Sequence, residues 1–475
     1  MRTAGRTVLF SALTVALSLS ALLVFPLYFL RSFAYAGLAA VVFAALGAIV
    51  VLPAALAVLG HRIDSLDLRK PLRRLLRLPA PRPAQLDTGA WSRIAHLVMR
   101  RPLPIATTVI VLLLVAAAPF SSVVFGLPDD RVLPAGAEGF RVAEAVRQDF
   151  PSRDAEALSV VAPDADGDGP TTAYATALSL VPGVERVDAA TGSFAGGAKV
   201  GPADPRLDAG GGTRLSVVPG IESYGPQGER LVVDVRATPS PLEQVLVDGP
   251  AARLLDTKAA LGARLPLALG LIVVTTLVLL FLFTGSVVLP LKALVLNLLS
   301  LCATFGAMVW VFQQGNLGFL VGSPVVTGTL DTTIPILMFC VLFGLSMDYE
   351  VCLLSRIKEV YDATGDNTRA VAVGLQRTGA IVTAAAALLA IVFLAFVSSD
   401  ITFIKLLGLG TALAVLVDAT LIRGALVPAF MRLAGQANWW APAPLRRLHD
   451  RIGLSEVEDV EVTPPAFDEQ RLARV

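Results

Sequence analysis

The sequence predicts an α-helical polytopic membrane protein with about eight transmembrane helices and one exterior α+β domain. Of its 475 residues, 55% are hydrophobic and only 16% are charged, and the mean hydropathy is +0.70. A soluble protein of this length carries more charge and fewer apolar residues. The remaining polar residues are concentrated in one long region. The net charge of +1 gives no basis for nucleic-acid binding.

The apolar runs are each roughly 20 to 30 residues long, as a helix needs to cross a bilayer. We expect spans at residues 7–30, 33–59, 103–124, 265–283, 287–312, 332–354, 380–397 and 403–433. The corresponding domains are a two-helix hairpin (1–60), a basic linker (61–102), a single span (103–124), an exterior domain (125–264), a five-helix unit (265–433) and a tail (434–475).

Charge distribution predicts the topology. Lys and Arg far outnumber Asp and Glu in residues 61–101, and basic residues recur in the loop 355–377 and in the tail, whereas residues 313–330 contain neither Lys nor Arg. Under the positive-inside rule the basic segments are cytoplasmic. We therefore expect a multi-pass plasma-membrane protein with both termini in the cytoplasm and residues 125–264 outside. Residues 79–83, which alternate Pro with other residues, predict a non-helical linker.

The polar region alternates helix-like and strand-like patterns. Helices are expected at 138–150, at 171–180 and from Pro241, and strands at 157–162, 184–188, 214–218 and 229–236. This order is typical of a small ferredoxin-like α+β sandwich.

Residues 5–60 and 379–435 share a layout. Each begins at a glycine, contains two spans joined by a short polar corner, and ends with a Pro-Ala pair followed by Gly60 or Gly435. Two copies of one helix pair indicate a pseudosymmetric transporter architecture. A polar domain and four spans precede the second copy only.

Asp348 is the leading functional candidate, because a carboxylate inside a hydrocarbon-spanning helix costs several kcal/mol unless it is paired or protonated. It lies about 12 Å from the end of its span. Burial raises a carboxylate pKa toward the range in which a proton gradient can load it. Tyr349 beside it has a hydroxyl that can reach a neighbouring helix. The alternative is a structural ion pair; we favour a proton carrier because no Lys or Arg lies near in the same span.

Neighbouring polar residues are supporting candidates. Ser346 and Glu350 belong to the same segment, and Glu350 points away from Asp348, as expected of a packing or gating contact. Asp418 in the last span is either a second relay member or a packing residue. Arg423 follows it by five residues, about 140° around an α-helix, so we expect the two to face apart. Asp331 is expected to cap its helix.

Other chemistry finds little support. The run 164–169 resembles the start of a calcium loop, but Ala175 stands where the closing carboxylate should be. The three histidines are dispersed without metal spacing, and the three cysteines lie in apolar segments. Neither a phosphate-binding loop nor a nucleophile elbow is present. We therefore expect no enzyme activity, cofactor or metal.

The motif block resembles a known family. Residues 344–351 (GLSMDYEV), 416–423 (LVDATLIR), 427–429 (VPA) and 438–440 (NWW) are similar to the C-terminal part of MMPL transporters of the resistance-nodulation-division superfamily. In that family twelve spans form two repeats, each with an exterior porter domain. Asp-Tyr pairs couple proton flow to the export of lipids or other hydrophobic molecules. By this resemblance Asp348 and Tyr349 are one such pair, and residues 265–433 form a sterol-sensing-like unit.

The resemblance implies a proton-motive-force-driven exporter of lipid-like or hydrophobic molecules. The first four spans, the first porter domain and the first Asp-Tyr pair have no counterpart here. We therefore expect either a longer reading frame or an N-terminal half-transporter partner chain, in preference to a degenerate relic. Membrane lipids are further partners, and a homo-oligomer is compatible with the sequence. The alternative function is a non-transporting membrane scaffold or sterol-sensing-like regulatory subunit.

Overall fold

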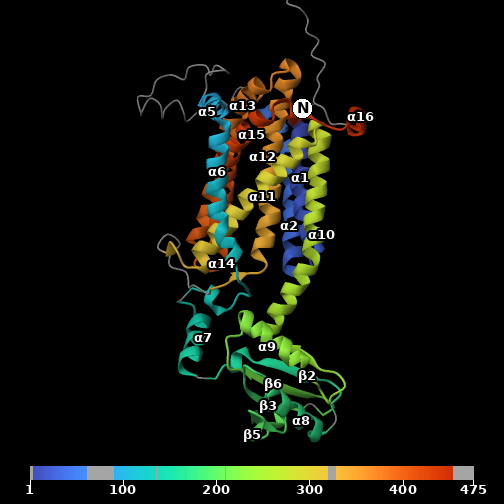
Figure 1. The fold of residues 1–475 in the computed structure, drawn as a ribbon, viewed down its shortest axis with the longest axis vertical. Coiled ribbons are helices and arrows are strands. Elements are labelled where there is room, and N and C mark those ends of the chain that lie inside the picture. Colours follow the sequence, from blue (N-terminus) through green and yellow to red (C-terminus); the bar gives the residue numbers. More distant parts are fainter. Residues whose placement is uncertain are drawn as a thin grey trace, which may run out of the picture.

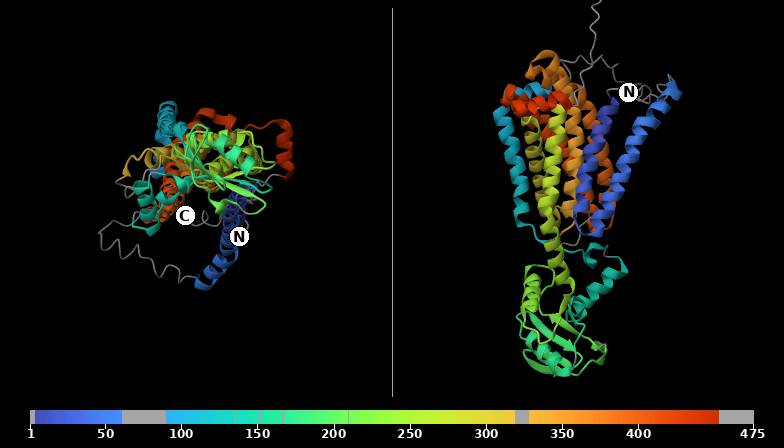
Figure 2. Two further views of the ribbon diagram at one scale, coloured as in Figure 1. Left: turned by 90° about the horizontal axis from the view of Figure 1, so that it is seen from below. Right: turned by 90° about the vertical axis from the view of Figure 1, so that its right-hand side faces the viewer.

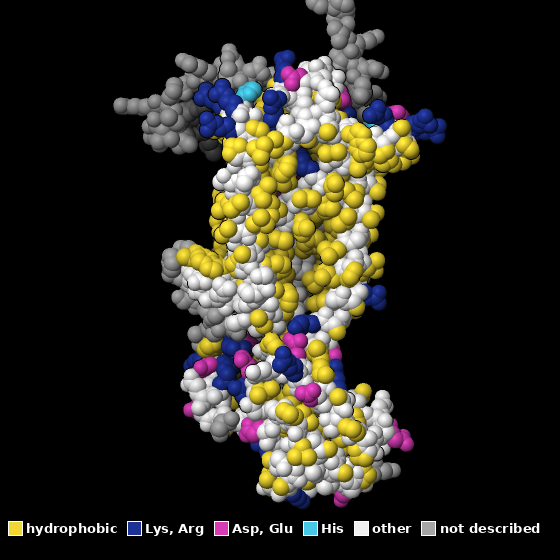
Figure 3. Space-filling model, in the orientation of Figure 1, with side chains coloured by type: hydrophobic (Ala, Val, Ile, Leu, Met, Phe, Trp, Pro, Cys, Tyr) yellow, Lys and Arg dark blue, Asp and Glu magenta, His cyan; other side chains and the backbone are white. Residues whose placement is uncertain are grey.

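The computed structural model describes residues 4–60, 90–134, 136–150, 152–165, 167–208, 210–318 and 328–452. A bundle of long helices carries a small sheet domain at one end (Figure 1). We call this the sheet end of the bundle and the other the far end. Hydrophobic side chains cover the flank of the bundle, with charged side chains at the far end and where the sheet domain joins (Figure 3). The expected linker at 79–83 lies outside the described residues.

Within the described part of the chain, seven helical rods are long and apolar enough to cross a membrane, and Val8–Val24 is a shorter apolar one. The predicted fold class, with about eight spans, is confirmed. The rods are α1 with η1 (Ala4–Ser20, Ala21–Val24); α2, η2 and α3 (Tyr28–Leu46, Gly47–Val51, Leu52–Leu59); α6 with η4 (Pro102–Ala117, Ala118–Ser122); α10 (Pro250–Thr284); α11 with η8 (Val288–Met308, Val309–Gln313); α12 (Ile334–Thr364); α13 with η10 (Asn367–Ala395, Phe396–Ser398); and α14, η11 and α15 (Thr402–Val417, Asp418–Leu426, Val427–Ala434).

Shorter helices lie at the far end. They are α5 (Ala90–Arg100), η12 (Gly435–Trp439) and α16 (Ala443–Ile452). The expected loop 355–377 is almost entirely helical, because α12 continues to Thr364 and α13 begins at Asn367. Gly365, in the left-handed conformation with φ of 68°, ends α12, and the Asp366 side chain accepts hydrogen bonds from the first backbone N–H groups of α13. The polar residues of this segment thus extend two helices beyond their apolar spans.

The centre of the bundle is α12, which packs against α1, α11, α13 and α14. Small residues allow close approach: a Cβ on Gly344 would lie only 3.2 Å from Ser18 Cβ and 3.3 Å from Val15 Cα of α1. The small residue Gly344 therefore lies at the contact of α12 with α1. By contrast, no residue in the most apolar window of α2 to α3 is buried, and this rod diverges from the bundle toward the far end (Figure 2).

The sheet domain has the predicted ferredoxin-like connectivity. In chain order it contains β2 (Leu158–Ala162), α8 (Asp168–Leu178), β3 (Val184–Ala189), β4 (Gly192–Ala195), β5 (Ala198–Gly201), β6 (Thr213–Pro219), α9 (Pro226–Ala237) and β7 (Leu246–Asp248). The strands form one antiparallel sheet in the order β5-β4-β3-β6-β2-β7. Removing the β4–β5 hairpin leaves βαββαβ with its central strands β2 and β6 adjacent. The hairpin was not predicted.

The expected strand at 229–236 is wrong. This segment belongs to α9, whose first turn contains Pro226 and whose buried residues are Gly228, Leu231, Val232 and Val235. Their spacing of three and four residues is helical, although the apolar run also fits a strand. The helix expected from Pro241 begins instead at Pro250.

Helix α10 joins the two parts of the molecule without a break. It starts beside β7 and α9 and runs through Pro266 to Thr284, so no interruption marks the expected boundary at residue 265. A second connection is β1 (Phe125–Gly126), which pairs in parallel with β8 (Leu330–Asp331) at the sheet end. The Asp331 side chain accepts hydrogen bonds from the N–H groups of Thr333 (2.6 Å) and Ile334 (3.2 Å), which confirms its predicted role as a cap of α12.

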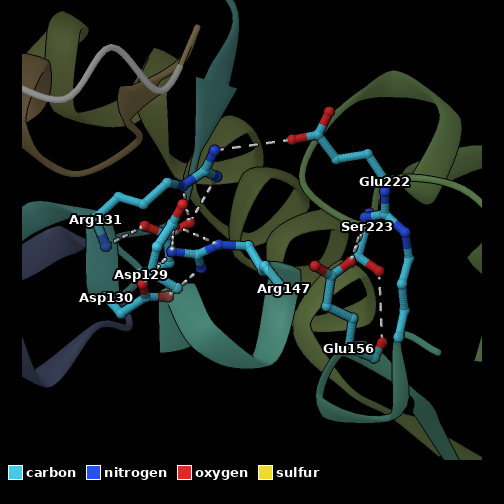
Figure 4. A network of polar contacts seen from close by, with 9 residues as sticks. Asp129, Asp130, Arg131, Arg147, Glu156, Glu222 and Ser223 are labelled. Atoms are coloured by element: carbon cyan, nitrogen blue, oxygen red, sulfur yellow. Dashed lines mark hydrogen bonds and ion pairs between the residues drawn. The ribbon is translucent and has the colours of Figure 1, made fainter. Parts of the chain in front are cut away.

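A charged network lies where the sheet domain meets the bundle (Figure 4). Arg147 of α7 (Glu138–Asp149) donates two hydrogen bonds to Asp130 in η5 (Asp130–Val132), of 2.9 and 2.8 Å. Burial opposes ionisation of Asp130, but the hydrogen bonds and charge of Arg147 outweigh it and lower the pKa of Asp130. Arg131 bonds to Asp129 (2.7 Å) and approaches Glu222 next to α9 (4.0 Å). Ion pairs thus link η5 to α7 and to the sheet domain.

The internal repeat seen in the sequence is present in the backbone. In each copy a long helix ends in a 3-10 turn (η1 or η10), a second helix follows, a π-helix (η2 or η11) precedes the Pro-containing helix, and a glycine ends it. The terminal glycines have nearly the same unusual dihedral angles: φ 48°, ψ −131° at Gly60 and φ 54°, ψ −125° at Gly435. The two copies share a backbone geometry that few other residues adopt.

Close packing between α6 and α11 depends on Gly306. A Cβ there would overlap the backbone carbonyl oxygen of Ala116 and lie 2.8 Å from the Cα of Ala117. We expect Gly306→Ala to lower stability by about 1–3 kcal/mol because neither backbone can yield easily. Gly270→Ala, where a Cβ meets nothing within 4 Å, is the matched control and should be neutral or stabilising. Thermal unfolding in detergent measures both, and equal melting temperatures would contradict this packing.

Candidate functional site

The polar residues of α12 contact three other helical segments within one and a half turns. Ser346 faces α11 and η11, Asp348 faces α1, Tyr349 faces η11 and Glu350 faces α11. A central helix can do this because successive side chains point about 100° apart. The segment therefore joins charged and polar groups from most of the bundle.

Asp348 is partly buried and accepts a hydrogen bond at Oδ1 from the hydroxyl of Ser11 in α1. The close approach of α1 at Gly344 makes this contact possible, and Ser18 adds a 2.6 Å hydrogen bond to the carbonyl of Cys340. Among the described residues no cation forms an ion pair with Asp348. Ser11 was not anticipated, since a serine in an apolar helix often bonds only to its own backbone.

The sequence-based geometry of Asp418 and Arg423 is wrong. Arg423 Nη2 lies 2.7 Å from Asp418 Oδ2, and both side chains are buried, with 2% and 8% of their surface exposed. The cause is η11, a nine-residue π-helix from Asp418 to Leu426. A wider π turn brings residues five apart onto the same face, whereas an α-helix separates them by about 140°. The Arg423 guanidinium therefore lies inside the bundle, where its positive charge neutralises the Asp418 carboxylate.

Ser346 is the hub of this cluster. Its hydroxyl lies 2.7 Å from Asn297 Oδ1 and 3.0 Å from Asp418 Oδ2, and its carbonyl accepts a hydrogen bond from Arg423 Nη2. A serine hydroxyl carries one hydrogen, so it donates to only one of these two acceptors at a time. The Ser346 hydroxyl hydrogen can therefore join α12 to α11 or to η11, but not to both at once.

Tyr349 contacts the cluster through its ring. The Arg423 guanidinium carbon lies 4.9 Å from the ring centroid, close enough for a cation–π interaction. A small cavity of about 20 Å³ is lined by Asn297, Ser346, Tyr349 and Asp418 together with apolar side chains. Its polar lining and size suit a single water molecule.

Glu350 pairs with a residue that the sequence analysis missed. Lys292 Nζ of α11 lies 3.8 Å from Glu350 Oε1, and the two side chains are 9% and 5% exposed. This agrees with a packing or gating contact for Glu350. Lys292 is the one charged residue of α11, the same signal that drew attention to Asp348.

Among the described residues, no group of three or more His, Cys, Asp or Glu side chains is arranged to hold a metal. Asp166 of the run 164–169 lies outside the described residues. The expectation that this run does not bind calcium therefore stays a prediction. The described residues place two carboxylates, Asp348 and Asp418, within the helical bundle, each hydrogen-bonded to a serine hydroxyl.

Comparison with known proteins identifies the family. The sequence model of the MMPL family matches residues 1–105 and 131–459. The chain belongs to the MMPL family. All the cluster residues described above lie within the matched ranges, and the resemblance drawn from the α12 and α14 motifs is confirmed.

Two MMPL relatives are informative. A membrane protein of Streptomyces coelicolor is 40% identical over 454 residues, which cover 95% of this chain and 59% of the relative. The trehalose monomycolate exporter MmpL3 of Mycolicibacterium smegmatis is 34% identical, over 96% of this chain and 46% of the exporter. The chain thus spans about half the length of these relatives. A solved heavy metal efflux pump overlays with a TM-score of 0.49 at 14% identity, covering 90% of this chain and 57% of the pump.

The buried ion pair yields a stability prediction. Arg423→Gln leaves the Asp418 carboxylate without its counter-charge and should destabilise the bundle by about 3–5 kcal/mol. The double variant Asp418→Asn/Arg423→Gln buries no charge and should recover much of this loss. Thermal unfolding in detergent at neutral pH makes the comparison. A double variant less stable than Arg423→Gln would show that the pair is not a coupled unit.

Proposed function

We propose that this MMPL chain is part of a proton-driven membrane transporter that exports lipid-like or hydrophobic molecules. In this proposal the protein lies in the plasma membrane, the sheet domain is outside and both termini are cytoplasmic, in accord with the basic segments at the far end. The observation that carries it is the set of polar and charged side chains around α12, which we call the α12 cluster. Its members are Ser346, Asp348, Tyr349 and Glu350 with their partners Ser11, Lys292, Asn297, Asp418 and Arg423. Two carboxylates, Asp348 and Asp418, lie inside the bundle with hydroxyl partners that can respond to a proton.

Asp418 supplies one protonation-dependent step. When Asp418 is charged, the Ser346 hydroxyl can donate to it, and Arg423 neutralises it. When Asp418 is protonated, its own hydrogen can bond to Ser346, which frees the Ser346 hydrogen for Asn297 on α11. Protonation thus reverses the hydrogen bond between α12 and η11 and allows a second one between α12 and α11. Such local changes bias helix packing when they favour one arrangement over another.

Asp348 supplies the second step. The charged carboxylate holds Ser11 by a charge-assisted hydrogen bond, which is stronger than a neutral one. Protonation weakens this link between α12 and α1. The two acids therefore act on different neighbours of the same helix, and their combined protonation can shift α12 relative to both. We assign Asp348 and Tyr349 to the relay itself and Asp418, Ser346 and Glu350 to supporting roles.

The proposed substrate class rests on an apolar cavity of about 410 Å³ among α10, α11 and α12 near the sheet end. Phe25, Phe120, Phe305 and Phe339 line it with aliphatic side chains, and Lys258 and Thr332 are its polar members. Its size is typical of small-molecule sites, and its lining suits an acyl chain. MmpL3 of Mycolicibacterium smegmatis is named for exporting a lipid, trehalose monomycolate.

We assign this activity to the whole transporter to which these residues belong. The remaining helices of the first repeat would come from the same polypeptide or from a half-transporter partner chain. Asp348 is only partly buried here, so its side chain is not fully enclosed by the described residues.

Removing the charge of Asp348 tests the coupling. In membrane vesicles containing the whole transporter, Asp348→Asn should reduce proton-gradient-driven movement of a fluorescent lysophospholipid by about tenfold or more. Asp400→Asn, at an exposed turn between η10 and α14, is the matched control and should transport normally. Unchanged transport by Asp348→Asn, combined with loss on deleting the sheet domain, would favour the scaffold function instead.

Filling the cavity tests the substrate class. Ala268 is 3% exposed and lines the cavity, whereas its neighbour Leu267 is 58% exposed on the outer flank of α10. Ala268→Trp should abolish lysophospholipid movement while Leu267→Trp leaves it intact. Proton uptake without substrate should persist in Ala268→Trp, because the α12 cluster is untouched. Equal transport by the two variants would exclude this cavity from the substrate path.

A further inference from the structure

Helix α16 has two distinct exposed faces. Leu445 and Leu448 lie within about 60° of each other around the helix, and 37% and 44% of their surface is exposed. Arg446, Arg447 and Arg451 occupy the other side and are all exposed. A short helix that exposes leucines on one side and arginines on the other is typical of a segment lying in a membrane interface.

The position of α16 is fixed by contacts at the end of α10. His449 packs edge-on against Phe281, with ring centroids 5.9 Å apart, next to Gly285, whose left-handed conformation (φ 70°) ends α10. Burial, the largest effect, and the nearby Lys358 lower the pKa of His449, so the imidazole is uncharged at neutral pH. It therefore serves as an apolar contact at the level where α10 ends.

The segment before α16 is anchored as firmly. The Ser286 hydroxyl donates to the Asn438 carbonyl (2.5 Å), and the Val287 N–H donates to the Trp440 carbonyl (3.1 Å). These bonds tie η12 to the turn between α10 and α11. From this point α16 extends outward beside the far end of the bundle (Figures 1 and 2). Its position along the bundle is thus set by these contacts of η12 and by the packing of His449 on Phe281.

The neighbouring surface of α10 identifies what surrounds α16. Val274 and Val278 on α10 are 59% and 49% exposed, so this helix is at the apolar perimeter of the bundle. In the space-filling view the apolar flank continues up to the region of α16, where basic side chains mark its outer limit (Figure 3). Exposed apolar side chains on a helix long enough to cross a membrane suit lipid acyl chains, and α16 with its exposed leucines packs against the end of this helix.

The arginines lack protein counter-charges within the described part of the chain. No Asp or Glu there forms an ion pair with Arg446, Arg447 or Arg451, and Asp450 is the one acid on α16 itself. Three cations against one carboxylate, held at a headgroup level, complement an anionic surface. Each basic residue at such a surface contributes attraction that falls off within a Debye length.

We propose that α16 is a docking surface for anionic phospholipids, with Leu445 and Leu448 among the acyl chains and Arg446, Arg447 and Arg451 binding the phosphate-bearing headgroups. This surface is separate from the α12 cluster and from the apolar cavity. It stands whether or not the chain transports protons. A protein partner that covers the same arginines is the competing occupant that the experiments must separate.

The depth of α16 gives the first test. Spin labels are placed at Leu448→Cys and, as the matched control on the opposite face, at Arg446→Cys, with the three native cysteines replaced by serine. In nanodiscs of phosphatidylcholine and phosphatidylglycerol, the label at 448 should be protected from a water-soluble nickel complex and accessible to oxygen. The label at 446 should show the reverse. Equal access of the nickel complex to both labels would place α16 in water and overturn the proposal.

Headgroup selectivity gives the second test and needs no cysteine replacement. The full chain should prefer spin-labelled phosphatidylglycerol over phosphatidylcholine. Arg446→Gln/Arg447→Gln/Arg451→Gln should reduce this preference at least about tenfold at low salt, on the order of fivefold for each charge. Replacement of the same three residues by Lys should retain it. An unchanged preference in the Gln variant would overturn the proposal, as would a preference for phosphatidylglycerol that appears only with added lysate protein.

Discussion

The cost of placing charge in a hydrocarbon environment governs the centre of this molecule. Asp348, Glu350 and Asp418 lie inside the bundle, and a different partner compensates the charge of each. Asp348 accepts a hydrogen bond from a serine hydroxyl, Glu350 lies 3.8 Å from a lysine, and Asp418 lies 2.7 Å from an arginine. An unpaired charge there would destabilise the fold by several kcal/mol. The helices that supply the partners, α1, α11 and η11, are therefore held around α12 by electrostatic need as well as by close packing.

The π-helix η11 shows how backbone geometry makes one of these solutions possible. The first repeat contains the same sequence of 3-10 turn, helix, π-helix and Pro-containing helix, and ends in a glycine of nearly equal φ and ψ. Counting back from the aligned glycines, Phe43 and Ala48 stand where the second repeat has Asp418 and Arg423. The first copy's π-helix, Gly47–Val51, is shorter and aligns with residues 422–426, so Phe43 still lies in α2. A π-helix before the Pro-containing helix is thus common to both copies, whereas its extension to Asp418 and the buried ion pair belong to the second.

Apolar periodicity was sufficient to predict the spans and the elements of the sheet domain from β2 to β3 together with β6, because long helices and alternating elements have strong sequence signals. It failed at residues 229–236, where Leu231, Val232 and Val235 suit either a strand or a helix face. Asp348 was found because an acid in an apolar run is rare. Its partner Ser11 could not be found, since that contact depends on tertiary packing at Gly344. The pairing of Asp418 with Arg423 was missed because an α-helical period was assumed where the chain adopts a π-helix.

The length and continuity of helix α10 have a mechanical consequence. Its 35 residues form one unbroken rod about 50 Å long, which begins at the sheet domain, forms a wall of the apolar cavity and ends beneath His449 of α16. A rod of this length acts as a lever arm: a tilt of about 5° would move one end by about 4 Å relative to the other. Motion of the sheet domain and the position of α16 at the far end of the bundle are therefore mechanically connected, with the cavity lying along α10 between them.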